Sequence, residues 1–258
     1  MRLKANSFIY TLLVMSVFVL FVSSWVKFIN NGGHDVGVPM LDIADVIDIN
    51  QTTAKDEKSS DARGTFIDSR DGNLYGWVKI DNQIWMAENL RYLPSVSAPN
   101  VSSNNKAYYY VYDYNGTDVN AAIASANYTT YGVLYNWTAA CVSCPTGWHL
   151  PSDEEWTALT DFVVERSGDG GKLKETGTTH WNSPNIGATN ETGFTALPGG
   201  IRLANARYWK IGSSGYWWSA TEYNVAFALD RVIHHSNTHV SKVCRDKNLG
   251  LSVRCIKD

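Results

Sequence analysis

Two cysteines two residues apart, Cys141 and Cys144, have the spacing of thioredoxin-like redox centres. Such centres sit in a βαβ context, and the residues around this pair do not show one. Cys244 and Cys255 complete a set of four cysteines. All four follow an apolar N-terminal segment that predicts export, so they lie in the exported part of the chain. An even number of cysteines in an oxidising compartment predicts two disulfide bonds. We therefore interpret the pair as structural, and predict neither a redox centre nor a zinc site.

A histidine cluster and two glutamates are the other residues that could do chemistry. His234, His235 and His239 could hold a transition metal. On a strand, however, adjacent side chains point to opposite faces, so His234 and His235 would not converge, and we predict a polar hairpin without metal. Glu88 and Glu222 lie near aromatic residues and could act as general acids. A hydrogen-bonded structural role is the favoured interpretation, so no catalytic residue is predicted.

Aromatic residues are abundant, with 10 Trp and 14 Tyr, and they supply the candidate ligand-binding residues. If residues 216–218 form a strand, Trp217 faces away from Tyr216 and Trp218. One face must then be core, and the other could offer a platform for a sugar ring or a protein partner. The residues that we expect at a ligand site are Trp181, Asn185, Trp209, Tyr216 and Trp218.

The N-terminal part of the chain predicts export to the outside of the cytoplasm. Arg2 and Lys4 precede an uncharged apolar run over 8–26, which is either a cleaved signal peptide or a membrane anchor. Residues 27–63 have the composition of a flexible linker, and residues 64–258 form the folded domain. The net charge of -3 removes the electrostatic case for a nucleic-acid partner. We expect a secreted or cell-envelope protein that meets a membrane only through this N-terminal segment.

The elements that would position these residues can be read from turn and helix signals. Turns at 71–73 and 81–82 predict strands over 64–67, 74–80 and 83–87. Residues 92–130 are expected to be a surface excursion with one strand near 107–112. A helix is predicted over 134–142. A second helix begins at Ser152, whose capping box with Glu155 precedes an apolar stripe, and this helix ends at Gly168 or Gly170. Residues 176–200 form a long loop, and strands follow near 215–221, 225–233, 239–244 and 251–256.

Five segments together resemble one bacterial family. They are WVKIDNQIWMAENLRYL, LYNWTAACVSCPTGWHLPSDEEWTAL, GGKLKETGTTHWNSPNIGATNETGFTALPGGIR, GSSGYWWSATEY and LSVRC. In this order they are similar to the Fibrobacter succinogenes major paralogous domain, an exported family without an established activity. The resemblance covers about residues 64–258. Cys144 and Cys255 belong to its pattern, whereas Cys141 and Cys244 do not.

A more distant resemblance is to the C-type lectin-like fold, which includes the formylglycine-generating sulfatase-modifying enzymes. It implies an α+β domain with two helices around a small, mostly antiparallel sheet with long loops, and a Cys144–Cys255 bond. Cys141 would then pair most simply with Cys244, while a Cys141–Cys144 link with a Cys244–Cys255 link is the local alternative.

The resemblance also shapes the functional expectation. The motifs by which such lectins bind calcium and sugar are absent, so we expect no cofactor and leave open only a structural calcium near Asn185, Asn190 and Glu191. The expected function is an exported, non-catalytic binding or cell-surface module whose ligand is a carbohydrate or a surface protein. The alternatives are a formylglycine-generating-like oxidase or other enzyme of this fold, and a purely structural envelope domain.

Overall fold

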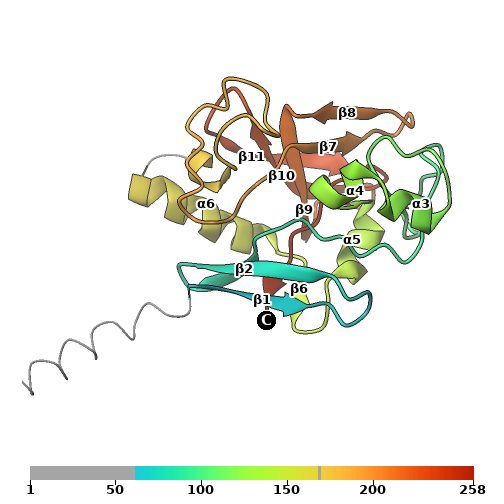
Figure 1. The fold of residues 1–258 in the computed structure, drawn as a ribbon, viewed down its shortest axis with the longest axis horizontal. Coiled ribbons are helices and arrows are strands. Elements are labelled where there is room, and N and C mark those ends of the chain that lie inside the picture. The colour runs from blue at the N-terminus through green and yellow to red at the C-terminus, as the bar shows by residue number, and fades with distance from the viewer. Residues whose placement is uncertain (1–61, 168–169) are drawn as a thin grey trace, which may run out of the picture. The chain divides into compact units, whose positions relative to one another are not determined.

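The structure of the chain is a computed structural model that describes residues 62–167 and 170–258. The predicted N-terminal export segment and most of the predicted linker lie outside these residues. Among the described residues, no helix is long and apolar enough to cross a membrane. The described part mixes several short helices with mainly antiparallel sheets, as an α+β class requires (Figure 1).

The first three predicted strands are present. They are β1 (Arg63–Ile67), β2 (Leu74–Ile80) and β3 (Gln83–Met86), which form an antiparallel meander through the two turns seen in the sequence. The end of the chain joins this sheet, because β12 (Ile256–Lys257) pairs with both β3 and β6 (Trp148–His149). The sheet order is therefore β1-β2-β3-β12-β6.

A second sheet holds the C-terminal strands. It contains β9 (Ser214–Glu222), β10 (Phe227–His234) and β11 (Val240–Asp246) in the order β11-β10-β9, all antiparallel. The expected last strand over 251–256 is broken: Leu251 and Ser252 make isolated bridges, and regular pairing begins at Ile256. Two-stranded ribbons complete the fold, β4 (Tyr109–Tyr110) with β5 (Leu134–Tyr135), and β7 (Gly199–Arg202) with β8 (Tyr208–Ile211).

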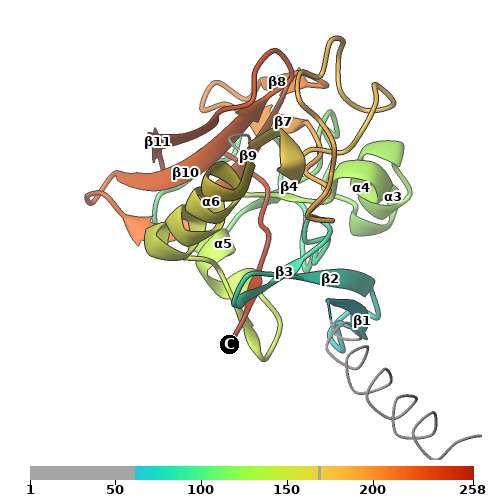
Figure 2. The same cartoon turned by 90° about the vertical axis from the view of Figure 1, so that its left-hand side faces the viewer.

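The helices are more numerous than the two expected. The predicted pair corresponds to α5 (Trp137–Ser143) and α6 (Asp153–Ser167), and both pack against the β9–β10–β11 sheet (Figure 2). The capping box is formed, since the Ser152 amide donates to Glu155 (2.8 Å) and the Glu155 amide donates to the Ser152 hydroxyl (3.2 Å). Of the two glycines expected to end α6, Gly168 lies outside the described residues, and Gly170 begins a 3-10 turn, η1 (Gly170–Leu173).

The segment over 92–130 is only in part the surface excursion that was expected. Most of its residues are exposed or half-buried, and its strand, β4, lies within the predicted 107–112. It also contains α3 (Val119–Ile123) and α4 (Ala126–Tyr131), which are capped by Asp118 and Ser125, and which lie together in Figure 1. Seven of its apolar residues are nevertheless buried in the core: Leu93, Val96, Tyr109, Tyr110, Val111, Ala122 and Tyr128. The two helices and these buried positions were missed because the apolar residues are scattered among polar ones, with no helical or strand period.

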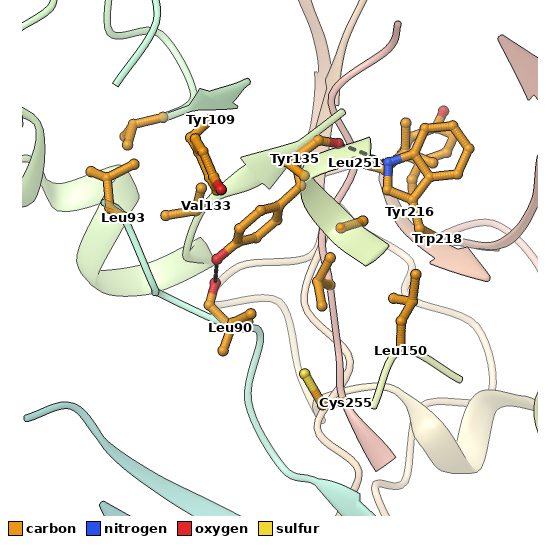
Figure 3. Packing of buried hydrophobic residues seen from close by; sticks show 14 of the residues in the cluster. Leu90, Leu93, Tyr109, Val133, Tyr135, Leu150, Tyr216, Trp218, Leu251 and Cys255 are labelled. Carbon is orange, nitrogen blue, oxygen red and sulfur yellow. Dashed lines mark hydrogen bonds between the residues drawn. The ribbon is translucent and has the colours of Figure 1, made fainter. Parts of the chain in front are cut away.

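The core has two clusters of buried residues, and β9 contributes to both. Tyr216 and Trp218 pack in the first cluster with Tyr135 and Leu251 (Figure 3). Trp217 points to the other side of the strand and packs in the second cluster with Trp156. Both faces of β9 are therefore buried, because the strand lies between two cores.

Buried cations hold the irregular parts of the chain in place. Lys174 donates to the carbonyl oxygens of Ile186 (2.6 Å) and Asn237 (3.0 Å). Arg202 and Arg254 are both fully buried and likewise donate to carbonyl oxygens of distant segments. Arg202 donates to those of Pro99, Val101 and Asn248, and Arg254 donates to those of Phe194 and Thr195. Loop carbonyl groups that have no partner in a sheet thus accept hydrogen bonds from buried cations. Long loops can therefore pack against the core without unpaired polar groups.

Candidate functional site

Four half-buried rings form two contacting pairs, one at the 176–200 loop and one at β8. They are His180, Tyr131, Tyr112 and Tyr208, and we call them the aromatic row. The rings of His180 and Tyr131 are 5.9 Å apart between centroids and those of Tyr112 and Tyr208 are 5.1 Å apart. The rings of His180 and Tyr131 meet edge-on and those of Tyr112 and Tyr208 are tilted, and each of the four residues keeps part of its surface accessible.

The two halves of the row are joined by the backbone of β7. A β-carbon on Gly199 would lie 3.4 Å from Tyr131, and one on Gly200 would lie 2.7 Å from the ring of Tyr112. Gly200 also has a φ of +68°, which side-chain-bearing residues rarely adopt. Two consecutive glycines thus let neighbouring rings lie against the same strand, one from α4 and one from the chain after β4.

A carboxylate stands at one end of the aromatic row. Both oxygens of Glu175 lie at 2.8 and 2.9 Å from Nδ1 of His180. This contact places a proton on Nδ1 and leaves Nε2 as an acceptor in the neutral imidazole. The end of the row therefore offers a ring face, an acceptor nitrogen and a carboxylate together.

The phenols of the aromatic row remain protonated over the ordinary pH range. Burial raises the pKa of Tyr131, and the nearby Glu175 and Tyr112 raise it further. Burial also raises the pKa of Tyr112 and of Tyr208. The hydroxyl of Tyr208 donates to the carbonyl oxygen of Tyr114 at 3.0 Å. These groups present neutral hydroxyls and ring faces, which suit a neutral polar ligand.

Of the five expected ligand residues, four are buried, so the prediction of an exposed platform at those positions is wrong. Trp181 and Trp218 are 1% and 0% exposed, and their indole N–H groups donate to the carbonyl oxygens of Ala196 (3.0 Å) and Tyr135 (2.7 Å). Tyr216 and Asn185 are also buried. Only Trp209 is accessible, at 52%, and it directly follows Tyr208 of the aromatic row.

The cysteines divide into one bond and two free thiols. Cys144 and Cys255 form the disulfide that the resemblance implied. Cys141 and Cys244 are both free and exposed, so the expected bond between them is absent, as are both links of the local alternative. Although part of Cys141 is exposed, its thiol is packed well enough that burial raises its pKa to about 11. Little of it is thiolate at neutral pH, which does not suit a reactive cysteine.

The other candidate residues have structural partners. The carboxylate of Glu88 accepts from the Gly76 amide (3.0 Å) and pairs with Arg91 (2.8 Å), and Glu222 pairs with Lys247. His234 and His235 were expected to point apart, and this expectation is wrong: their ring centroids lie 4.8 Å apart with the planes inclined by 34°, because β10 ends at His234 and strand alternation does not extend to His235. Their Nδ1 atoms contact the Ser236 hydroxyl and the Ser183 carbonyl oxygen.

The residues named for a structural calcium also bond elsewhere. The Asn185 amide donates to two carbonyls, Asn190 bonds to Thr195, and Glu191 pairs with Lys172. No group of three or more His, Cys, Asp or Glu suited to a metal ion occurs within 62–167 and 170–258.

Two cavities are lined by other residues than the rings of the aromatic row. A cleft of about 130 Å³ is lined by Thr129, Thr130, Thr195, Glu88 and Arg91 among others. A groove of about 310 Å³ lies between the β2–β3 turn and α6, and its wall carries charges of both signs. Neither cavity is lined by a ring of the aromatic row, and the charged residues of the cleft already pair with each other.

Sequence reasoning missed every ring of the aromatic row, because its members come from four separate segments. One signal could have pointed to it. The consecutive Gly199 and Gly200 occur in a segment that forms a strand, where glycine marks a close approach of another group.

Comparison with known proteins gave one match. Residues 78–257 match the sequence model of a family described as the Fibrobacter succinogenes major domain. No curated protein and no solved structure matched the chain.

Proposed function

We propose that this chain, which belongs to the Fibrobacter succinogenes major domain family, is a non-catalytic module that binds carbohydrate outside the cytoplasm. The observation that carries the proposal is the aromatic row with the Glu175–His180 pair at its end. Sugar rings stack their C–H faces on aromatic rings, while carboxylates, imidazoles and phenols bond to their hydroxyls. Trp209, on the strand that carries Tyr208, extends the accessible aromatic surface.

The fold that we propose for this module is C-type lectin-like. Two features support it: the disulfide that ties the residue after α5 to the final residues of the chain, and the pairing of β12 with β3, which brings the two ends of the domain together. The same disulfide supports export, because such bonds persist in oxidising compartments. A protein ligand on the same surface is the second possibility for the binding partner.

The oxidase alternative has less support. Such an enzyme needs a reactive cysteine pair, and here Cys144 is bonded to Cys255 while the Cys141 thiol has a raised pKa. The structural-envelope alternative makes no use of the accessible rings. The proposal differs from it in one measurable respect, which is that a glycan binds.

A glycan array probed with the full chain tests the proposal. Tyr112→Ala and Tyr131→Ala should each weaken binding by about fivefold, since losing one ring contact is worth roughly 1 kcal/mol. Tyr223→Ala is the matched control, because Tyr223 is 66% exposed on the β9–β10 turn and its loss should leave binding unchanged.

Absence of binding to any glycan by the unaltered chain would contradict the proposal and favour the structural alternative. Binding that is unchanged in Tyr112→Ala and Tyr131→Ala would place the site elsewhere.

A further inference from the structure

The outer edge of β11 has main-chain groups that are directed away from its sheet. One residue beyond the β10–β11 ladder, the Lys247 amide donates to the Ala226 carbonyl oxygen (3.0 Å). Because antiparallel pairing alternates, Ser241, Val243 and Arg245 then direct their N–H and C=O groups toward β10. Lys242, Cys244 and Asp246 direct theirs outward.

These outward groups are open to a further strand. Among the described residues, the main-chain N–H and C=O groups of Lys242 and Cys244 have no partner. Cys244 is exposed, and the Lys242 side chain is 54% exposed. Exposed edges of this kind are templates for strand addition.

The sequence of β11 is complementary to itself in one antiparallel register. If Cys244 of one copy lies opposite Cys244 of another, each Lys242 lies opposite the other copy's Asp246. A shift that centres the pairing on Lys242 would instead oppose two lysines, and centring it on Val243 gives no charge pair. Opposite charges across strands are favourable and like charges are unfavourable, so the complementarity selects the register centred on Cys244.

We propose that β11 is a homodimerisation edge, and that two copies of this chain join their three-stranded sheets into one six-stranded sheet with Cys244 on the two-fold axis. The outward N–H and C=O groups of Cys244 bond to their counterparts in the second copy. The C=O of Lys242 accepts from the Asp246 N–H, and the N–H of Lys242 donates to the Asp246 carbonyl oxygen, which already accepts from the Leu249 amide (3.1 Å) and takes this bond as its second. Lys242 keeps its bond to Asp153 (2.6 Å), since its ammonium has three donors.

Thiol cross-linking of the full chain in intact cells tests the register. An added oxidant takes two electrons and two protons from the two facing thiols, and a bond forms between their sulfur atoms. Residues opposite each other at a hydrogen-bonded position have Cα atoms about 5.5 Å apart, within reach of a disulfide. On a non-reducing gel, Cys141→Ser should give as much covalent dimer as the unaltered chain, and Cys244→Ser should give at least about tenfold less. Dimer that depends on Cys141, or no dimer at all, overturns the proposal.

Sedimentation of the purified full chain tests the edge itself without chemistry. Cys244→Pro removes an outward N–H and leaves the β10 ladder intact, so it should yield monomer. Asp246→Lys should also weaken association, by about tenfold, by opposing two lysines. The double variant Lys242→Asp with Asp246→Lys should restore it.

Urea unfolding of each variant separates a folding defect from a lost interface. If a variant fails to fold, Cys244→Ser and Asp246→Lys are sedimented side by side in its place. A stable dimer in Cys244→Pro, or a monomeric unaltered chain, overturns the proposal. A glycan-binding result of either kind leaves this test unaffected, because β11 contributes no residue to the aromatic row.

Discussion

Strand β9 and the aromatic row are both built from aromatic residues, but the rings of β9 are buried and those of the row are partly accessible. In β9 the three rings are consecutive in sequence, and all are buried, because the strand lies between two cores. Their indole N–H groups are satisfied within the protein, by the Tyr135 carbonyl and the Asn89 side chain. In the aromatic row the rings come from four segments and keep part of their surface accessible. A run of aromatic residues therefore marks the interior here, and the surface cluster is assembled only by the fold.

The largest expected effect on the free energy of unfolding comes from removing the buried side chain of Trp218. Trp218→Ala should lower the free energy of unfolding by about 3–5 kcal/mol, because it leaves a large cavity and removes one of the two hydrogen bonds that the Tyr135 carbonyl accepts, the other coming from the Leu251 amide. Trp209→Ala, which removes an indole that is 52% exposed, should cost less than about 1 kcal/mol. Urea unfolding measures both, and equal costs would show that β9 is not the interior strand described.

The next effect separates the bonded cysteines from the free ones. Replacing Cys144 and Cys255 together by alanine should cost about 2–5 kcal/mol, because their bond closes a loop of 111 residues between the end of α5 and the last strand. Cys141→Ser should change stability by less than about 0.5 kcal/mol. The comparison is made by urea unfolding without reductant, and it fails if Cys141→Ser is the more damaging change.

The smallest effect concerns a polar contact at the surface. Burial acts to lower the pKa of His149, but its hydrogen bonds to Asp258 (2.6 Å) and Glu155 (2.8 Å) outweigh this and raise the pKa above 6.5. A group with a raised folded pKa stabilises the protein below its unfolded pKa, and this contribution is lost as pH rises through the folded pKa. The stability difference between the unaltered chain and His149→Gln should thus be larger at about pH 5.5 than at about pH 8.5.

Two-dimensional NMR of the His149 ring checks the same point directly. A neutral imidazole can donate to only one of two carboxylates, so one contact should weaken on deprotonation. A pKa for His149 at or below 6.5, or a stability difference that does not vary with pH, would contradict the prediction.

Local signals in the sequence predicted the regular elements well. Strands β1, β2 and β3 lie where the turns at 71–73 and 81–82 placed them, because turn residues act through their own backbone preferences. The start of α6 was predicted for the same reason, since a capping box is complete within four residues. The family resemblance further indicated the Cys144–Cys255 bond, which local patterns alone left open.

Burial of single residues could not be predicted in the same way. Tyr216 and Trp218 were expected to form a platform because strand alternation tells which residues share a face, but not what covers that face. The segment over 92–130 was assigned to the surface because its core residues follow no period, although single residues of it, such as Tyr128 of α4, are buried.

The sequence by itself determined the family, the α+β class, the first strands and the capped helix, because each depends on neighbouring residues or on ordered motifs. Only the tertiary structure decided which aromatic residues are accessible and that Cys141 and Cys244 are free thiols. The physical reason is that both depend on contacts between distant segments. Gly199 and Gly200 let rings from α4 and from the chain after β4 lie side by side, and Cys141 and Cys244 stay free where no bond joins them.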